Sequence, residues 1–129
     1  MGRVSAAFDE DAGILKIKVI GQAGYAEVVP VIRAEYPRHP QAPVLWDFPP
    51  GAFSTLDIEE LKGIGQVLKD MASYRTGART AFILREKAEN AQMKFYVELM
   101  RLQKSSADYR IFQDRDGAVR WLLQEDDPD

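Results

Sequence analysis

The fold is decided by the stretch PVLWDFPPGAFSTLDIEELKGIGQVL, residues 43–68. It opens with the run Val44–Phe48, which is apolar except for Asp47 and predicts a buried strand. Two prolines and a glycine then end the strand. After them, Leu61 and Ile64 begin an apolar stripe at the spacing of an amphipathic helix. A strand that leads through a tight loop into a helix is the repeating unit of α/β sheets, so this stretch predicts an α/β domain.

The residues before this stretch predict an antiparallel hairpin. Strand-like runs at residues 4–8 and 14–20 are joined by an acidic segment that ends in Gly13. Lys16 and Lys18 alternate with apolar residues in the second run, which is typical of a strand with one face in water.

One helix is expected before the central strand in the sequence and another after it. Apolar residues at helical spacing over residues 25–36 predict a helix that begins near Ala26. Pro30 would then lie in its first turn, where a missing N–H costs no intrahelical bond. The second helix is expected to open at Ser54 or Thr55. Its glycines, which we expect where the helix lies close on the sheet, are Gly63 and Gly65.

Strand and helix signals alternate again in the rest of the chain. Residues 80–84 and 109–113 predict strands, with a long helix at about 88–104 between them. Asp114 or Asp116 caps a final helix. The expected order is β-β-α-β-α-β-α-β-α, a mixed sheet whose later strands are parallel, with about four helices. We predict one domain over residues 1–124, followed by an acidic tail, 125–129.

Composition narrows the classes of function. A formal net charge of −3 disfavours nucleic acid as a partner, because phosphate binding draws on a concentrated basic surface. The absence of cysteine excludes disulfides, thiolate catalysis and cysteine-based metal sites. No apolar run approaches the roughly 20 residues that cross a bilayer, and the first residues are unlike a secretory signal. These features predict a cytoplasmic protein without stable membrane insertion.

The sequence contains no recognisable catalytic constellation. Dinucleotide, nucleotide-phosphate, esterase and zinc-protease motifs are all missing. His39 is the only histidine and lies in a proline-rich loop, where an exposed structural role is expected. We therefore expect no catalytic residue, no metal and no cofactor. An enzyme that uses Asp47 or His39 is the least favoured hypothesis, because neither has a visible partner.

Asp47 lies where binding sites of α/β proteins collect, at the loops beyond the strand ends. The alternative is that it accepts hydrogen bonds from loop amides and only shapes the turn. Ser54 and Asp57 fit a capping box, and the acids that follow make this helix start a poor phosphate site. The candidate partner loop comprises Asp47, Phe53, Ser54, Thr55 and Asp57.

The helix expected at 88–104 carries two apolar stripes, although one suffices to cover a sheet. The second stripe packs against a neighbouring helix or forms a homodimer or partner surface, for which methionine and aromatic residues are suited. Its members are Met93, Tyr96, Val97 and Met100.

The order of elements resembles the STAS-like domains, especially the SpoIIAA-like branch of small stand-alone bacterial proteins. The residues that carry the resemblance are Val44–Phe48 with the capped helix after it, the strand Thr80-Ala81-Phe82-Ile83-Leu84, and the ending Asp116-Gly117-Ala118-Val119-Arg120-Trp121-Leu122. The resemblance covers nearly the whole chain. It implies a SpoIIAA/STAS-like fold and a non-enzymatic regulatory role through protein contacts.

One departure from the family and one alternative follow. Phosphorylated members carry an Asp-Ser pair at the helix start, where this chain has Thr55-Leu56-Asp57-Ile58. We therefore expect neither Ser54 nor Thr55 to be phosphorylated. The branch is also likened to Sec14-type lipid-binding folds, which implies a small apolar ligand as the alternative function. The candidate pocket residues for it are Trp46, Phe53 and Met71.

Overall fold

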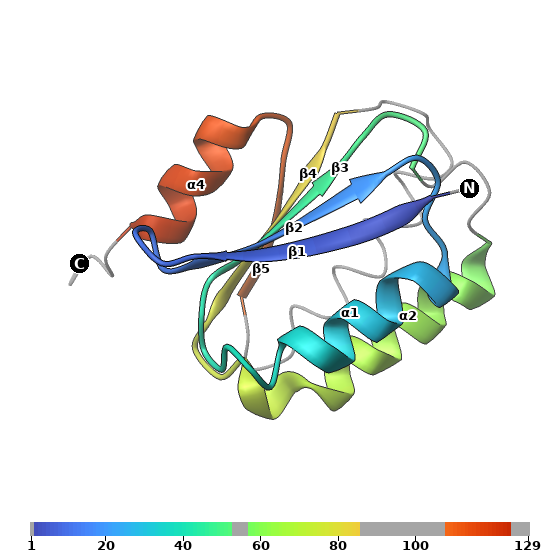
Figure 1. Cartoon of the computed structure of the whole chain (residues 1–129), viewed down its shortest axis with the longest axis horizontal. Helices are drawn as coiled ribbons and strands as arrows, with labels where there is room; N and C mark the ends of the chain where they lie inside the picture. The colour runs from blue at the N-terminus through green and yellow to red at the C-terminus, as the bar shows by residue number, and fades with distance from the viewer. Residues whose placement is uncertain (1, 53–56, 86–107, 125–129) are drawn as a thin grey trace.

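The computed structural model describes residues 2–52, 57–85 and 108–124. Five strands form one sheet in the spatial order β1-β2-β3-β4-β5 (Figure 1). The strands are Arg3–Asp9 (β1), Ile14–Ile20 (β2), Val44–Phe48 (β3), Arg79–Leu84 (β4) and Asp108–Phe112 (β5). The helices are Tyr25–Glu35 (α1), Ile58–Asp70 (α2) and Arg115–Leu123 (α4), with a short 3₁₀ helix at Ala72–Tyr74.

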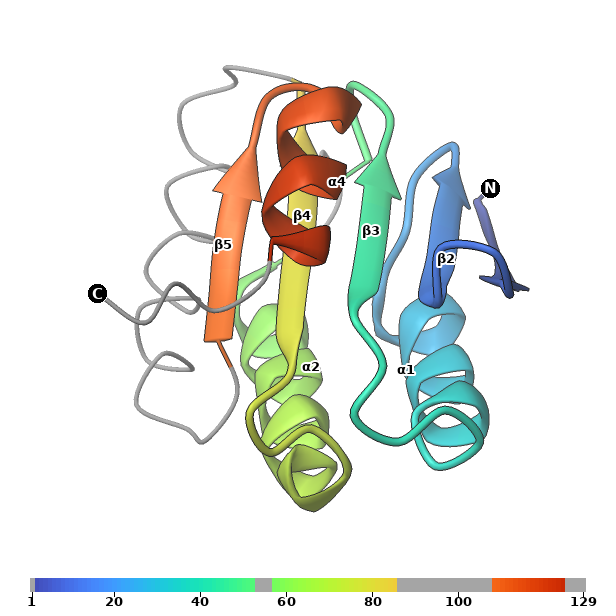
Figure 2. The same ribbon diagram turned by 90° about the vertical axis from the view of Figure 1, so that its left-hand side faces the viewer.

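The sheet is mixed, as the sequence predicts. β1 and β2 form the antiparallel hairpin, and β2, β3, β4 and β5 pair in parallel. Figure 2 shows these parallel strands side by side with their carboxyl ends at one edge. The predicted strand at 44–48 is confirmed, and β4 is buried on both faces from Thr80 to Leu84. The chain is therefore an α/β protein.

Helices lie on both faces of the sheet (Figures 1 and 2). α1 and α2 cover one face, where Trp46, Phe48 and Phe82 belong to the larger core cluster. α4 covers part of the other face and packs Trp121 and Leu122 against β3 and β4. Parallel strands buried on both faces read as continuous apolar runs, which explains why β3 and β4 are evident in the sequence.

Pro30 does not lie in the first turn of α1. The helix begins at Tyr25, and the N–H of Val28 already bonds to the Gly24 carbonyl at 3.1 Å. Pro30 is thus inside the helix and has no N–H to donate to the carbonyl of Ala26. Its exposed position places that missing bond at the water-facing side of α1.

The start of α2 also differs from the prediction. Asp57, not Ser54, is the N-cap, and its carboxylate accepts the Glu60 N–H at 2.7 Å. Asp57 and Glu60 have the spacing of a capping box themselves, so the helix begins three residues later than Thr55. Ser54 and Thr55 lie outside the described residues.

Gly63 serves the contact between helices rather than a contact with the sheet. A Cβ built on Gly63 would lie 2.9 Å from the Tyr25 ring, which is too close for two carbon atoms. The absence of a side chain therefore lets α2 approach α1. Gly65 is buried within α2.

A buried arginine, Arg75, connects the segments that lead into β3 and β4. Arg75 is fully buried and donates to the Ala42 carbonyl, to the Arg79 carbonyl at 3.0 Å and to Thr80 Oγ1 at 2.8 Å. Its guanidinium also lies 5.2 Å from the centre of the Tyr36 ring. Because a buried cation needs such partners, Arg75 joins the loop before β3 to the start of β4.

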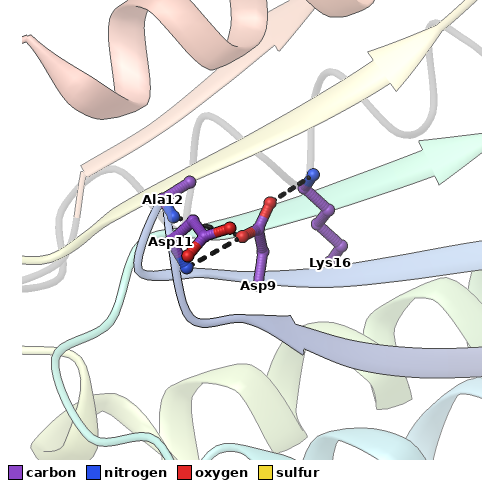
Figure 3. A network of polar contacts seen from close by, with 4 residues as sticks. All are labelled: Asp9, Asp11, Ala12 and Lys16. Carbon is purple, nitrogen blue, oxygen red and sulfur yellow. Dashed lines mark hydrogen bonds and ion pairs between the residues drawn. The ribbon is translucent and has the colours of Figure 1, made fainter.

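The hairpin turn is held by Asp9 (Figure 3). Its carboxylate accepts the N–H groups of Asp11 and Ala12 at 3.1 Å and pairs with Lys16 at 2.8 Å. These contacts hold the pKa of Asp9 below its usual range, chiefly through the Lys16 hydrogen bond. Gly13 closes the turn with φ 71°, a conformation that glycine adopts without strain.

The final helix follows the first of its two predicted caps, since Asp114 accepts the Gly117 N–H at 2.7 Å. The helix and stripe predicted at 88–104, with Met93, Tyr96, Val97 and Met100, lie outside the described residues, as does the tail 125–129. Within the described part of the chain, no helix combines the length and apolar character needed to cross a membrane.

Candidate functional site

An ion pair marks the edge of the sheet where β3 and β4 end. Arg85 follows β4, and its Nη1 donates to Asp47 Oδ1 and to the Phe48 carbonyl at 3.2 Å. The side chain of Asp47 is 17% exposed and that of Arg85 is 37% exposed. We call Asp47, Arg85, Asp57 and Glu59 the β3–β4 edge.

Asp47 favours the charged form of Arg85. The carboxylate raises the pKa of Arg85, chiefly through their hydrogen bond, so the guanidinium stays charged. The Asp47 carboxylate accepts a charge-assisted hydrogen bond from that guanidinium. Among the described residues, the hydrogen-bond partner of the Asp47 side chain is Arg85, which directly follows β4. The arrangement therefore presents a fixed pair of opposite charges at this edge.

The loops beside this edge are tied to each other. The Ala23 N–H, before α1, donates to the Ala52 carbonyl, after β3, at 2.8 Å. Gly51 turns that loop with φ 79°, and Ala52 is buried beneath it. Since both loops hold one another, the described part of this edge forms a defined surface.

At each helix start at this edge, a carboxylate binds one backbone N–H. Glu27 accepts the Gly24 N–H at 2.9 Å, and Asp57 accepts the Glu60 N–H. A helix start binds an anion through free N–H groups and its positive dipole end. The acids Glu27 and Asp57 take up one of these N–H groups each and place negative charge at the helix starts, which disfavours a bound phosphate.

His39 lies away from Asp47. It precedes β3 on the opposite edge of the sheet, where its ring stacks on Phe8 with centroids 4.4 Å apart. Its Nε2 is 3.6 Å from the Glu35 carboxylate. The structure therefore does not bring His39 and Asp47 together. Among residues 2–52, 57–85 and 108–124, no group of three histidine, cysteine or acidic residues is placed to hold a metal.

An apolar cavity lies between the sheet and the helix pair α1 and α2. It is lined by Val28, Ile32, Trp46, Phe48, Leu61, Ile64, Leu68 and Phe82. Its volume is ≈ 30 Å³, about two water-sized spheres by the usual threshold for a hydrated cavity. Of the three candidate pocket residues, Trp46 is among the residues that line this cavity. Met71 is not among its lining residues, and Phe53 lies outside the described residues.

Arg85 is the site residue that the sequence did not reveal. Asp47 pairs with Ile83 in the sheet register, and side chains two residues apart on a strand share a face. An arginine two positions beyond that partner can therefore reach the carboxylate diagonally. This signal was present in the sequence, but it required the pairing of β3 with β4 to be known.

Neither protein-family models nor curated proteins give a match to this chain.

Proposed function

We propose that this protein is a non-enzymatic, STAS-like interaction module that binds a partner protein at the β3–β4 edge. The observation that carries the proposal is the Asp47–Arg85 pair, partly exposed at the edge where binding sites of α/β proteins gather. Among described residues only Nη1 of Arg85 is engaged. Its Nε and Nη2 are donors that a partner's carboxylate or carbonyl can accept.

The surroundings of the pair support recognition of a surface rather than conversion of a substrate. Two loops meet there through the Ala23–Ala52 bond, and Asp57 fixes the start of α2. A partner then meets a pre-organised surface, which lowers the ordering cost of binding. Arginine is also enriched at protein interfaces.

The alternative is a small apolar ligand in the cavity beneath Trp46. Its lining is wholly apolar, which favours such a ligand. Its volume of ≈ 30 Å³ is far below the roughly 150 Å³ of a cavity that admits benzene. A lipid chain would require α1 and α2 to move away from the sheet, so surface binding is the better-supported function.

Site-specific photocrosslinking tests the proposal. A photoreactive amino acid replaces Glu59, at the β3–β4 edge, or Lys69, at the far end of α2; both positions are exposed. Extract from the source organism should give a saturable adduct with the probe at position 59 only. The substitution Arg85→Glu should reduce the yield about tenfold or more, as expected for an interfacial charge. Arg120→Glu, the same change of charge at an exposed position of α4, should not reduce the yield.

Two results would count against this function. An adduct that forms equally from both positions, or that ignores Arg85→Glu, would show that the edge is not the contact surface. A stoichiometric added mass in native mass spectrometry of gently purified protein would favour the apolar-ligand alternative. That added mass should then be lost on Val28→Phe, which fills the cavity.

A further inference from the structure

β1 is an edge strand of the described sheet. It pairs only with β2 in the described residues, and in Figures 1 and 2 it runs along the outside of the sheet. A strand at such an edge presents unpaired N–H and C=O groups to another chain. Proteins commonly block such edges with proline, a bulge or a lysine that points inward. β1, with the sequence RVSAAFD and continuous pairing over all its residues, has none of these.

The hydrogen-bond pattern identifies which residues of β1 face outward. The Leu15 N–H points to β3, where it bonds to the Pro43 carbonyl at 2.9 Å. Because successive residues of a strand direct their backbone groups to opposite sides, Ile14, Lys16 and their alternates point to β1. Their partners on β1 are the odd-numbered residues. Val4, Ala6 and Phe8 therefore direct their N–H and C=O groups away from the sheet.

We infer that β1 pairs antiparallel with β1 of a second copy of this chain, about a two-fold axis at Ala6. Only this register overlaps all residues of β1 with their counterparts. It places Val4 opposite Phe8 of the second copy and Ala6 opposite itself. Each such pair can exchange two backbone hydrogen bonds, so every outward group of β1 gains a partner in one continuous sheet.

The side chains of β1 fit this register on both faces. Arg3 and Asp9, at opposite ends of the strand, come to lie opposite one another across the axis. Asp9 already pairs with Lys16, and Arg3 of the second copy would add a second cation to that carboxylate. On the other face, Phe8 is 36% exposed and would be covered by Val4 of the second copy. Opposite charges and an aromatic–aliphatic contact are favourable cross-strand pairs.

The size of the contact sets its strength. A single pair of strands is small beside the roughly 1,200 Å² of a stable interface. We therefore expect a reversible dimer that forms with rising concentration. The inference does not depend on the proposed partner edge, since β1 and the β3–β4 edge are separate parts of the sheet.

Amide hydrogen exchange by NMR at low and high protein concentration tests the inference residue by residue. The amides of Val4, Ala6 and Phe8 should exchange quickly in dilute protein and become at least about tenfold more protected at about 1 mM. Those of Ser5 and Ala7, which bond to β2, should be protected at both concentrations. Sedimentation should show a parallel rise from 14.6 kDa towards twice that mass.

Two substitutions separate loss of pairing from loss of folding. Ala6→Pro removes only an outward N–H and leaves the bonds to β2 in place, so it should abolish the rise in mass. Arg3→Glu sets like charges opposite each other and should shift the dimer midpoint at least about tenfold. Lys62→Glu, the same change of charge at an exposed position of α2, should not shift the midpoint. A mass that stays monomeric to about 1 mM, or a dimer without alternate-residue protection in β1, would overturn the inference.

Discussion

Arg85 fastens the end of β4 to the end of β3 through the carboxylate of Asp47 and the carbonyl of Phe48. The pair lies at the carboxyl edge of the parallel strands, so it stabilises the edge that we propose as the binding surface. The pair is partly exposed, chiefly through Arg85, so a partner can reach it. The same two side chains therefore join the ends of β3 and β4 and form part of the proposed binding surface.

A double-mutant cycle measures this pair. Asp47→Ala, Arg85→Ala and the double variant should give a coupling of about 0.5–1 kcal/mol, the range for ion pairs that water screens. Urea denaturation supplies the unfolding free energies. The coupling should shrink in 1 M salt. A coupling of zero at low salt would mean that the two groups do not interact in solution.

The core hydrogen bond between Trp46 and Tyr36 should be important for stability. Trp46 Nε1 donates to the Tyr36 hydroxyl at 3.1 Å, and both residues are fully buried. Tyr36→Phe leaves the indole N–H without an acceptor, which should cost about 1–3 kcal/mol of unfolding free energy. Tyr74→Phe, on an exposed tyrosine, is the matched control and should change it by less than about 0.5 kcal/mol. Equal effects of the two substitutions would contradict the assignment.

Stability should fall in alkaline solution because of Tyr36. Burial raises the pKa of Tyr36 well above the ordinary value, although the nearby Arg75 opposes the shift. The unfolded chain then releases this proton from about pH 10 upward, while the folded protein retains it. Unfolding is therefore favoured increasingly above that pH. Tyr36→Phe should reduce the slope of unfolding free energy against pH in this range.

The capping residue of α2 can be tested directly. Asp57→Ala removes the acceptor of the Glu60 N–H and should cost about 1 kcal/mol. Ser54→Ala, at the position first expected to cap the helix, should be nearly neutral. Thermal unfolding of both variants distinguishes them. A larger loss of stability in Ser54→Ala than in Asp57→Ala would contradict the assignment of Asp57 as the cap.

The positions of these strands in the sequence were predictable because each strand carries its own pattern. Val44–Phe48 and the run at 80–84 are continuous apolar segments, as strands buried on both faces must be. The hairpin follows from the turn at Gly13, where φ is positive. These signals are local, so one sequence suffices to detect them.

What the sequence did not reveal depends on contacts between distant residues. Gly63 was expected against the sheet, but its reason is the Tyr25 ring of α1. Arg85 had no visible role until β3 and β4 were paired. The cap of α2 was misplaced because Ser54 and Asp57 both fit capping patterns, and local pattern alone does not choose between them.

The central claim, binding at the β3–β4 edge, is tested most directly by mapping amide chemical shifts of the labelled chain. The protein captured by crosslinking, once purified, is the titrant. We predict that the largest changes fall on Asp47, Asp57, Glu59 and Arg85, and that Arg85→Glu abolishes them. Changes confined to the opposite edge around His39, to β1 or to residues 93–100 would contradict the claim.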